Sequence, residues 1–346
     1  MRNVNTQSPE GLLREFGLHY VSAAELTIER RRRGKGFVYL NGRGRALRDQ
    51  RTLYRLKRLA VPPAYDAVRF AADPQAHLQA VGLDAAGRVQ YRYHPDWEKV
   101  RELRKARRLA RLAGVLPVIR RWVRRHLRDQ EPSRERAVAA VIELVALSAL
   151  RPGSEAYARQ HGTRGAATLL KNDLSIKGAR IHLNFVGKGG KEIEKEIASR
   201  QLATALNKLS ELPGRRMFQY RNGGGRIVPL RRRDVNVMLR EITGRAVSLK
   251  DFRTLIASAK ALQRLAALEP KPSARGRRRQ VLATMQTVAA DLANTPAICR
   301  RSYVHAAVVA AFDSGALQRI AHRAGSLRSA AAAEKMLAKV LERIAL

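Results

Sequence analysis

The sequence predicts an α+β protein with a small, mainly antiparallel β domain over residues 1–96 and a larger, mainly α-helical domain over residues 97–346 that carries a small β-insert. Three observations predict this fold class. Between about residues 17 and 94, short apolar runs of period two alternate with turn residues. From there on, helical periodicity dominates the chain. Between Leu169 and Ile197 the period returns to two, which places a few strands inside the helical part.

The N-terminal part is predicted to consist of short strands separated by turns. The expected strands share β-branched or aromatic residues and flanking Gly, Pro, Asn or Asp, and they are Phe37–Leu40, Tyr65–Ala71, His77–Val81 and Val89–Tyr93. The last two are expected to be joined by a tight turn at Asp84–Gly87. In the last strand the alternation places Val89, Tyr91 and Tyr93 on one face, and Gln90 and Arg92 on the other.

The C-terminal part is predicted to be mostly helical. Helical patterns cover 101–128, 134–150, 200–209, 234–243, 250–268 and 278–293. In the first of these, leucines together with Ile119 and Trp122 form a stripe expected to face the core. Ser133 is an expected N-cap, and Thr295-Pro296 is expected to begin a further helix. The stretch 269–277, rich in Pro, Lys and Arg, is expected to be a mobile basic loop.

The charge of the chain indicates a polyanionic partner. The 346 residues include 68 Lys+Arg against 29 Asp+Glu, a formal net charge of +39. Because 45% of the residues are hydrophobic, the chain is not a disordered basic tail. Nucleic acid is favoured over an anionic membrane, because arginine rather than lysine dominates and further domain follows the basic helix. A basic protein whose arginines merely cover solvated helices is the plainer alternative.

Several classes of protein are excluded or disfavoured by what the sequence lacks. Cys299 is the only cysteine, which excludes an internal disulfide, zinc fingers and cysteine-ligated clusters. No apolar run is long enough to span a membrane, and no signal peptide is recognisable, so we expect a cytoplasmic protein. The glycine cluster at 222–225 lacks the Lys-Ser/Thr of an ATP-binding loop and is expected to be a turn. We therefore expect no cofactor, no metal and no small-molecule substrate.

Five polar residues, spread over the larger domain, form a set suited to phosphate chemistry: Arg151, Lys188, Arg253, Asn294 and Tyr303. The first follows an expected helix, the second lies at the tip of the β-insert, the third lies in the first turn of a helix, and the last two flank and occupy the Thr-Pro helix. Each alone has an ordinary structural explanation, such as an arginine that interacts with a helix dipole. Their order along the chain is what points to chemistry.

The chain resembles the compact type IB DNA topoisomerases of poxviruses and bacteria over nearly its whole length. The N-terminal strings that carry the resemblance are Ala60–Tyr65, His77–Gly82 and Gly87–His94. The C-terminal strings are Arg151–Glu155, Phe185–Lys188, Asp251–Thr254, Asn294–Pro296 and Ser302-Tyr303. The resemblance implies the fold shared by these enzymes and the tyrosine recombinases, with residues 1–96 acting as a DNA clamp.

The resemblance also implies a reaction and a role for each residue. Tyr303 attacks a DNA phosphodiester, forming a 3′-phosphotyrosyl bond. Arg151 and Arg253 hold the phosphate, and Lys188 protonates the leaving 5′ oxygen. Asn294 stands where viral and eukaryotic members carry histidine, so it is expected to donate a hydrogen bond and not to carry a proton. Strand rotation followed by religation would then relax supercoiled duplex DNA without ATP.

The small domain is expected to contact the duplex through Gln90, Tyr91, Arg92 and Tyr93, with Gln90 able to read adenine edges in the major groove. Packing of the tyrosines against the sheet is the structural alternative for these residues. The expected partner is duplex DNA, bound by a monomer associated with the nucleoid.

Two other functions stay open at this level. A site-specific tyrosine recombinase shares the chemistry, but recombinases usually carry His-x-x-Arg around the second arginine, where this chain has Lys250-Asp251-Phe252-Arg253. A non-catalytic basic DNA-binding protein would explain the charge alone. His182 and His305 are expected to be structural.

Overall fold

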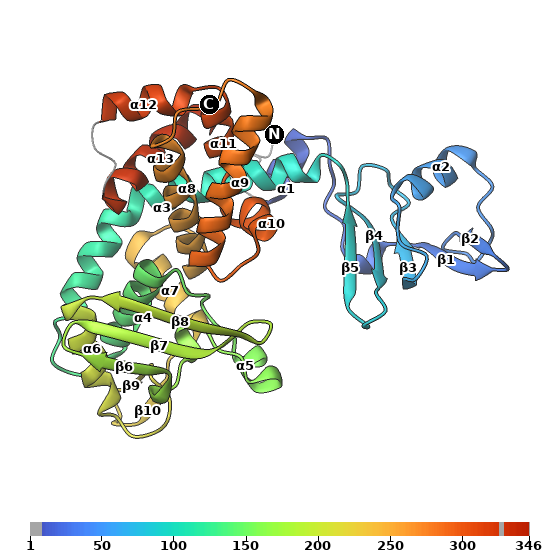
Figure 1. Ribbon diagram of the computed structural model, residues 1–346. Coiled ribbons are helices and arrows are strands. Elements are labelled where there is room, and N and C mark those ends of the chain that lie inside the picture. The colour runs from blue at the N-terminus through green and yellow to red at the C-terminus, as the bar shows by residue number, and fades with distance from the viewer. Residues whose placement is uncertain (1–8, 325–328, 346) are drawn as a thin grey trace, which may run out of the picture. The chain divides into compact units, whose positions relative to one another are not determined.

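The computed structural model describes residues 9–324 and 329–345, and the chain forms two compact units, Met1–Arg104 and Lys105–Leu346. Helix α3 (Trp97–His126) begins in the smaller unit and continues through the larger one. The predicted domain boundary between residues 96 and 97 coincides with the start of this helix and stays a prediction. An antiparallel sheet in the smaller unit and mostly helices in the larger one confirm the α+β fold class (Figure 1).

The smaller unit is built on a five-stranded antiparallel sheet with the strand order β2-β1-β3-β4-β5. Its strands are β1 (Ile28–Arg33), β2 (Gly36–Leu40), β3 (Asp66–Phe70), β4 (Leu78–Leu83) and β5 (Val89–Tyr93). The tight turn between β4 and β5 is confirmed, since Gly87 N donates to Asp84 O at 2.8 Å. Two helices, α1 (Pro9–Glu15) and α2 (Gln50–Arg58), and a 3₁₀ turn at Ala23–Glu25 complete this unit before α3.

In the smaller unit, sequence patterning missed α1, β1 and α2. Strand β1 reads Ile-Glu followed by four arginines, so it shows no alternation of apolar and polar residues. Arg30 is nevertheless buried, and its guanidinium donates to the carbonyl oxygens of Val61, Pro62 and Tyr65, each at 2.9 Å. A buried arginine of this kind is satisfied by tertiary contacts, which a local pattern cannot show.

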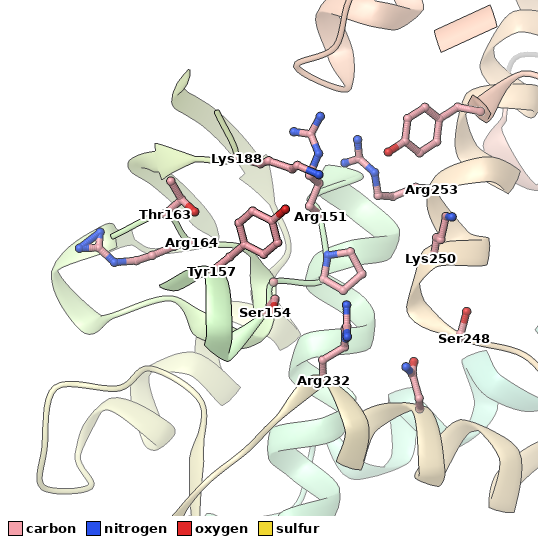
Figure 2. A pocket seen from close by; sticks show the side chains of 14 residues that line it. Arg151, Ser154, Tyr157, Thr163, Arg164, Lys188, Arg232, Ser248, Lys250 and Arg253 are labelled. Atoms are coloured by element: carbon pink, nitrogen blue, oxygen red, sulfur yellow. The ribbon is translucent and has the colours of Figure 1, made fainter. Parts of the chain in front are cut away.

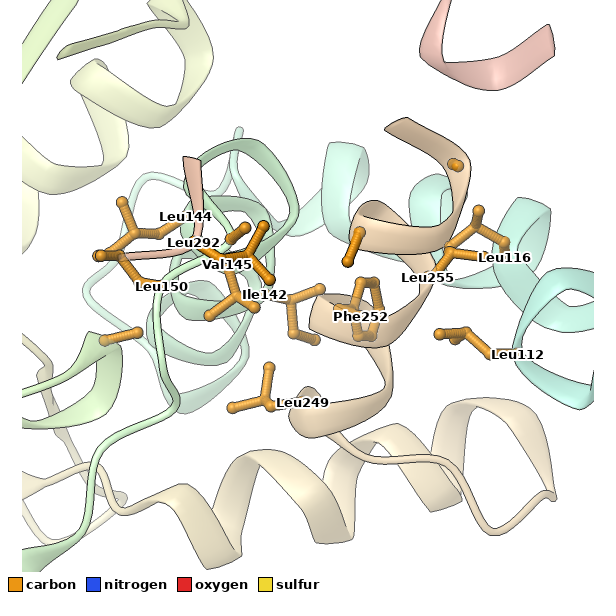
Figure 3. Close-up of a cluster of buried hydrophobic side chains, with 14 of the residues drawn as sticks. Leu112, Leu116, Ile142, Leu144, Val145, Leu150, Leu249, Phe252, Leu255 and Leu292 are labelled. Carbon is orange, nitrogen blue, oxygen red and sulfur yellow. The ribbon is translucent and has the colours of Figure 1, made fainter. Parts of the chain in front are cut away.

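The larger unit contains most of the helices and one large hydrophobic core. After α3 they are α4 (Arg134–Ser148), α5 (Glu155–His161), α6 (Arg200–Ser210), α7 (Arg232–Thr243), α8 (Leu249–Ala266), α9 (Ala274–Asp291), α10 (Pro296–Ile298), α11 (Ala306–Asp313), α12 (Ala316–Ala324) and α13 (Ala330–Ala345). Figure 3 shows α3, α4 and α8 meeting in this core through residues such as Leu112, Ile142 and Phe252. The predicted stripe on α3 is buried at Leu109 and Ile119, as expected.

The predicted β-insert is a three-stranded antiparallel sheet in the order β6-β7-β8. Its strands are β6 (Leu174–Lys177), β7 (Arg180–Gly187) and β8 (Lys191–Ala198), and a separate hairpin, which patterning missed, joins β9 (Gln219–Arg221) to β10 (Ile227–Pro229). Short 3₁₀ turns cover Ala166–Thr168 and Lys171–Asp173. Ile181, Leu183 and Phe185 point into the core, as their alternation predicts. The glycine cluster at 222–225 is a turn, as expected.

Three local expectations need correction. The stretch 269–277 is not a loop throughout, because α9 begins at Ala274, where Ser273 caps the helix by accepting a hydrogen bond from Gly276 N at 3.1 Å. Arg253 is the fifth residue of α8 and therefore lies in its second turn, not its first. Tyr303 ends a π-helical segment, Cys299–Tyr303, rather than lying in an ordinary α-helix.

Within the described residues, no helix is both long and apolar enough to cross a bilayer.

Candidate active site

A cationic pocket of about 640 Å³ lies in the larger unit (Figure 2). The residues that line it come from the loop after α4, from α5 and the loop after it, from the β7–β8 turn, from α7, from α8 and its N-cap, and from the π-helical segment. They are Arg151, Pro152, Gly153, Ser154, Tyr157, Thr163, Arg164, Lys188, Arg232, Asn236, Ser248, Lys250, Arg253 and Tyr303. Six of the fourteen are Arg or Lys, and none is Asp or Glu. Such a lining favours a phosphate over a neutral ligand.

Arg151 is held by a loop that follows α4. Ala149 ends the helix in a left-handed conformation with φ 54°, which turns the chain away from the helix axis. The Arg151 carbonyl then accepts a hydrogen bond from Ala166 N at 2.8 Å. Gly165 passes so close that a Cβ on it would lie 2.5 Å from Arg151 O and 2.6 Å from Gly153 N. The position of Arg151 therefore depends on a close backbone contact that glycine alone permits.

Arg253 is almost fully buried, with an exposed fraction of 2%. Its guanidinium donates to Ala149 O and, at 3.1 Å, to Leu292 O. These two carbonyls belong to the ends of α4 and α9, so Arg253 ties together the segments that carry Arg151 and Asn294. Among the described residues, Arg253 Nε makes no hydrogen bond. Burial lowers the pKa of Arg253 from its ordinary value, but a guanidinium stays charged at any physiological pH.

Tyr303 lies against this arginine. The Arg253 Cζ atom is 4.9 Å from the centre of the Tyr303 ring, a cation–π contact. Burial by itself would raise the pKa of the Tyr303 phenol, but the positive charges of Arg253 and Arg151 outweigh it, and the pKa lies below its ordinary value. A phenol with a lowered pKa is a better nucleophile near neutral pH than a free tyrosine.

Lys188 lies at the tip of the β7–β8 hairpin, followed by Gly189 and Gly190, both with positive φ. Its Nζ atom is 5.3 Å from the ring centre of Tyr157, and the side chain is otherwise exposed. Figure 2 shows Arg151, Lys188 and Arg253 directed toward the same region of the pocket. A turn, rather than a helix, therefore presents this ammonium group to the pocket.

Asn294 does not line the pocket but contacts a residue that does. Its Oδ1 atom accepts a hydrogen bond from Arg151 Nη2, and its Nδ2 atom donates to Leu292 O at 3.3 Å. The amide therefore orients Arg151 and keeps one N–H for another acceptor. The structure thus brings Arg151, Lys188, Arg253 and Tyr303 to one pocket, with Asn294 beside them.

The pocket also contains cations that sequence reasoning did not single out: Arg164, Arg232 and Lys250. Arg232 stands in a run of three arginines, so nothing in the local sequence distinguishes it. Lys250 does carry a signal, since it lies three residues before Arg253 on the same helix and so shares a face with it.

Sequence reasoning also did not single out Lys195, a lysine of β8 that contacts the segments behind the pocket. Its Nζ donates to Ser148 O at 2.8 Å and to Asp291 O, which are carbonyls at the ends of α4 and α9. Burial and nearby cations lower its pKa to about 8.

Of the expected DNA-contacting residues, Tyr91 and Tyr93 lie on one face of β5 and are 47% and 41% exposed. Their rings stack at a centroid distance of 6.2 Å, and Tyr93 continues the stack onto Trp97. Gln90 and Arg92 lie on the other face, where Gln90 Nε2 donates to Asp84 Oδ2 at 2.9 Å. The strand therefore presents the tyrosines together and not all four residues on one surface.

The two expected structural histidines lie in different settings. His305 is 3% exposed and begins α11, where its Nδ1 accepts from Ala307 N at 3.1 Å. His182 lies on β7, 3.7 Å from the carboxylate of Glu194 on β8.

Comparisons with known proteins agree on one family. Residues 94–326 match the family model described as the catalytic core of eukaryotic DNA topoisomerase I, and residues 36–84 match the N-terminal domain of bacterial DNA topoisomerase IB. The chain is also 29% identical, over 284 residues, to DNA topoisomerase 1B of Acanthamoeba polyphaga mimivirus, a match that covers 80% of this chain and 84% of the relative. The first match spans two-thirds of the chain and contains every residue of the cationic pocket.

Proposed function

The chain belongs to the type IB DNA topoisomerases, enzymes that relax supercoiled DNA, and we propose that Tyr303 is the nucleophile with which it does so. One observation carries the proposal. Within the family match, the ring centre of Tyr303 lies 4.9 Å from Cζ of the buried Arg253, at the wall of a pocket lined by six cations. The closeness of Tyr303 to these cations supports the assignment of a nucleophile with charge-stabilising groups beside it.

In the proposed cleavage step, the Tyr303 oxygen forms a bond to phosphorus while the bond from phosphorus to the 5′ oxygen breaks. The phenolic proton is lost to solvent, and the DNA is left joined to the protein through a 3′-phosphotyrosyl bond. The lowered pKa of Tyr303 supports this role, because Arg253 and Arg151 stabilise the phenolate relative to the phenol.

Charge that develops on the non-bridging oxygens requires donors that are already in place. Arg151 and Arg253 are proposed to bind these oxygens, since each offers parallel N–H groups and permanent charge. The free Nε of Arg253 and the remaining N–H of Asn294 support the assignment, because both are donors beside the pocket. Preorganised donors of this kind typically contribute ~10²- to 10³-fold each to the rate.

Lys188 is proposed to protonate the 5′ oxygen as it leaves. Its place on a hairpin tip beside the pocket supports this role, since the side chain can reach past the arginines. Religation reverses the step: the 5′ hydroxyl attacks phosphorus, Lys188 takes up its proton, and Tyr303 leaves. The phosphotyrosyl bond conserves the energy of the broken phosphodiester, so the cycle needs no nucleotide.

We further propose that the enzyme acts as a monomer on nucleoid DNA in the cytoplasm, and that Tyr91 and Tyr93 contact the duplex from the smaller unit. The five proposed catalytic residues gather within a single copy of the chain, so the proposed mechanism needs no residue from a second copy, which supports a monomer. The exposed aromatic faces of β5 support a contact with DNA.

The test is to capture and map the covalent adduct. Wild type, Tyr303→Phe and Tyr157→Phe are each incubated with nicked or supercoiled duplex, quenched with detergent, and digested to locate the modified peptide and the strand end. Tyr157 is the matched control because it is the other tyrosine among the pocket residues. We expect wild type and Tyr157→Phe to form an adduct on a 3′ end, and Tyr303→Phe to bind DNA normally without forming one. An adduct through another residue would overturn the proposal, and relaxation that requires a particular target sequence would favour a recombinase.

A further inference from the structure

We propose that Lys105 and Arg108 of α3 are positioning residues that hold Tyr303 and Arg253 in their reactive arrangement. The inference rests on the roles proposed above for those two residues. It assigns a task to a helix whose side chains neither line the pocket nor belong to the predicted catalytic set.

Arg108 fixes the start of the helix that carries Arg253. Its Nε donates to Asp251 Oδ1 at 3.0 Å and its Nη2 to Asp251 Oδ2 at 2.9 Å, a bidentate ion pair. Asp251 is 6% exposed and also accepts from Ser248 N at 2.8 Å, so it forms a capping box with Ser248, the N-cap of α8. Arg253 follows two residues later, within one helical turn of the fixed carboxylate.

Lys105 contacts the backbone on both sides of Tyr303. Its Nζ atom donates to Arg301 O and to Val304 O, each at 3.4 Å. The same segment is held from α8 by Ser258, whose Oγ donates to Tyr303 O at 3.1 Å and accepts from His305 N at 3.0 Å. The π-helical segment is therefore clamped between two helices, and α3 provides one side of the clamp.

The geometry of α3 makes this a single device. Lys105 and Arg108 are three residues apart and so lie on one face of the helix. Ala106 and Leu109, adjacent to them in sequence, are 1% exposed and anchor the helix in the core of the larger unit. A side chain fixed on such an anchored helix restricts the groups that it binds, and a displacement of about 1 Å at a reacting group can cost ~10²-fold in rate.

The experiment measures chemistry separately from binding and from folding. Arg108→Ala removes the ion pair, Lys105→Met removes the ammonium while keeping the length of the side chain, and Arg108→Lys keeps the charge without the bidentate geometry. Arg121→Ala is the matched control, because Arg121 is an exposed arginine of the same helix. Each variant is assayed for duplex affinity, thermal unfolding and single-turnover cleavage across a pH series, alongside Tyr303→Phe.

We expect Arg108→Ala and Lys105→Met to cleave ~10- to 10²-fold more slowly with duplex affinity unchanged, Arg108→Lys to recover only part of the loss, and Arg121→Ala to match wild type. A purely structural role for Lys105 and Arg108 would leave the pH dependence of the cleavage rate unchanged. The cations that face Tyr303 are Arg253, Arg151 and Lys250. If Arg253 shifts away from Tyr303, the effect of burial on the phenol is no longer outweighed and the pKa of Tyr303 rises. The increase of the cleavage rate with pH then occurs at higher pH.

Wild-type cleavage rates and an unchanged pH profile in both Arg108→Ala and Lys105→Met would overturn the inference while leaving the proposed function intact, provided that wild type forms its adduct through Tyr303. A fall in thermal stability with no change in the rate or pH profile of the folded protein would also overturn it. Absence of a Tyr303 adduct in wild type would instead reject the proposed function.

Discussion

Two opposing effects act on the Tyr303 hydroxyl, and their balance supports the proposed role of this phenol as the nucleophile. Burial disfavours the phenolate, whereas Arg253 and Arg151 favour it, and the net pKa lies below its ordinary value. The arginines are thus proposed to act twice, first on the nucleophile and then on the phosphate. The two proposed roles give a reason for burying the charged Arg253 side chain, because an apolar side chain at this position would not carry the desolvation penalty of a buried charge.

Substitution of Lys188 should slow cleavage selectively. We expect Lys188→Ala to reduce the single-turnover cleavage rate by ~10²- to 10⁴-fold on ordinary DNA, because the 5′ alkoxide would leave unprotonated. A substrate with sulfur in place of the bridging 5′ oxygen should recover most of the rate, since a thiolate leaves without a proton. Lys191→Ala, at an exposed lysine of the same hairpin, is the control. Equal losses on both substrates would reject the acid role.

Lys195 should make stability depend on pH in a predictable direction. Its pKa falls from 10.5 in the unfolded chain to about 8 in the folded protein, so the unfolded state binds more protons between those two values. Below about pH 8, Lys195 is charged in both states, and burying the charged ammonium lowers the free energy of unfolding. This destabilisation disappears as the pH rises toward 10.5, because the folded protein then buries a neutral amine. We expect the stability of wild type relative to Lys195→Met to increase across that interval, as measured by urea unfolding at several pH values. A constant difference would show that Lys195 titrates normally.

At the scale of elements, the site depends on segments that end or interrupt regular structure. Arg151 follows a left-handed helix cap, Lys188 lies in a hairpin turn, and Tyr303 ends a π-helical segment. The β7–β8 strands and the α8 helix supply rigid supports for these irregular segments. Reactive side chains placed on short loops between rigid elements combine precision with accessibility.

The contact between the 151–153 and 165 segments should be intolerant of a single methyl group. Gly165→Ala would place its Cβ 2.5 Å from Arg151 O, so we expect the loop to shift, stability to fall by about 1–3 kcal/mol, and cleavage to slow with Arg151 displaced. Gly114→Ala on α3 is the matched control, because among the described residues no atom beyond its own turns of the helix backbone lies within 4 Å of its Cβ position. That control should stabilise the helix by up to about 1 kcal/mol. Urea unfolding and single-turnover cleavage measure both effects, and wild-type behaviour of Gly165→Ala would contradict the expectation.

Patterning identified most elements correctly and failed where tertiary contacts replace local signals. Strands β3 to β5, the β-insert and helix α4 show the alternation or capping that predicts them. Strand β1 did not, because arginines occupy positions that usually alternate. The start of α9 was missed because Ser273, its N-cap, lies in a segment rich in Pro, Lys and Arg, a composition typical of loops.

At the scale of the whole molecule, the net charge of +39 governs how the enzyme meets DNA. Each phosphate that a cation neutralises releases counterions, so the duplex affinity should fall steeply with salt. Among the pocket cations, Arg232 is exposed at the start of α7 and so suits a test of a single phosphate contact.

We expect Arg232→Gln to lower the slope of log affinity against log salt by about one, because one phosphate contact is lost. Tyr303→Phe, which changes no charge, should keep the wild-type slope. Fluorescence anisotropy over a salt series, from about 50 to 200 mM, measures both. Identical slopes in wild type and Arg232→Gln would show that this arginine makes no phosphate contact.

The sequence by itself determined the class of partner, the type of most elements and the chain order of the five proposed catalytic groups, because charge, periodicity and short motifs are local properties. It could not select Arg232, Lys195 or Arg108 from 68 basic residues that look alike in sequence. The tertiary structure decided which cations converge on the pocket and that Arg253 lies buried against Tyr303. Convergence depends on contacts between segments far apart in the chain, such as Arg151 with Asn294, and no local pattern encodes such a contact.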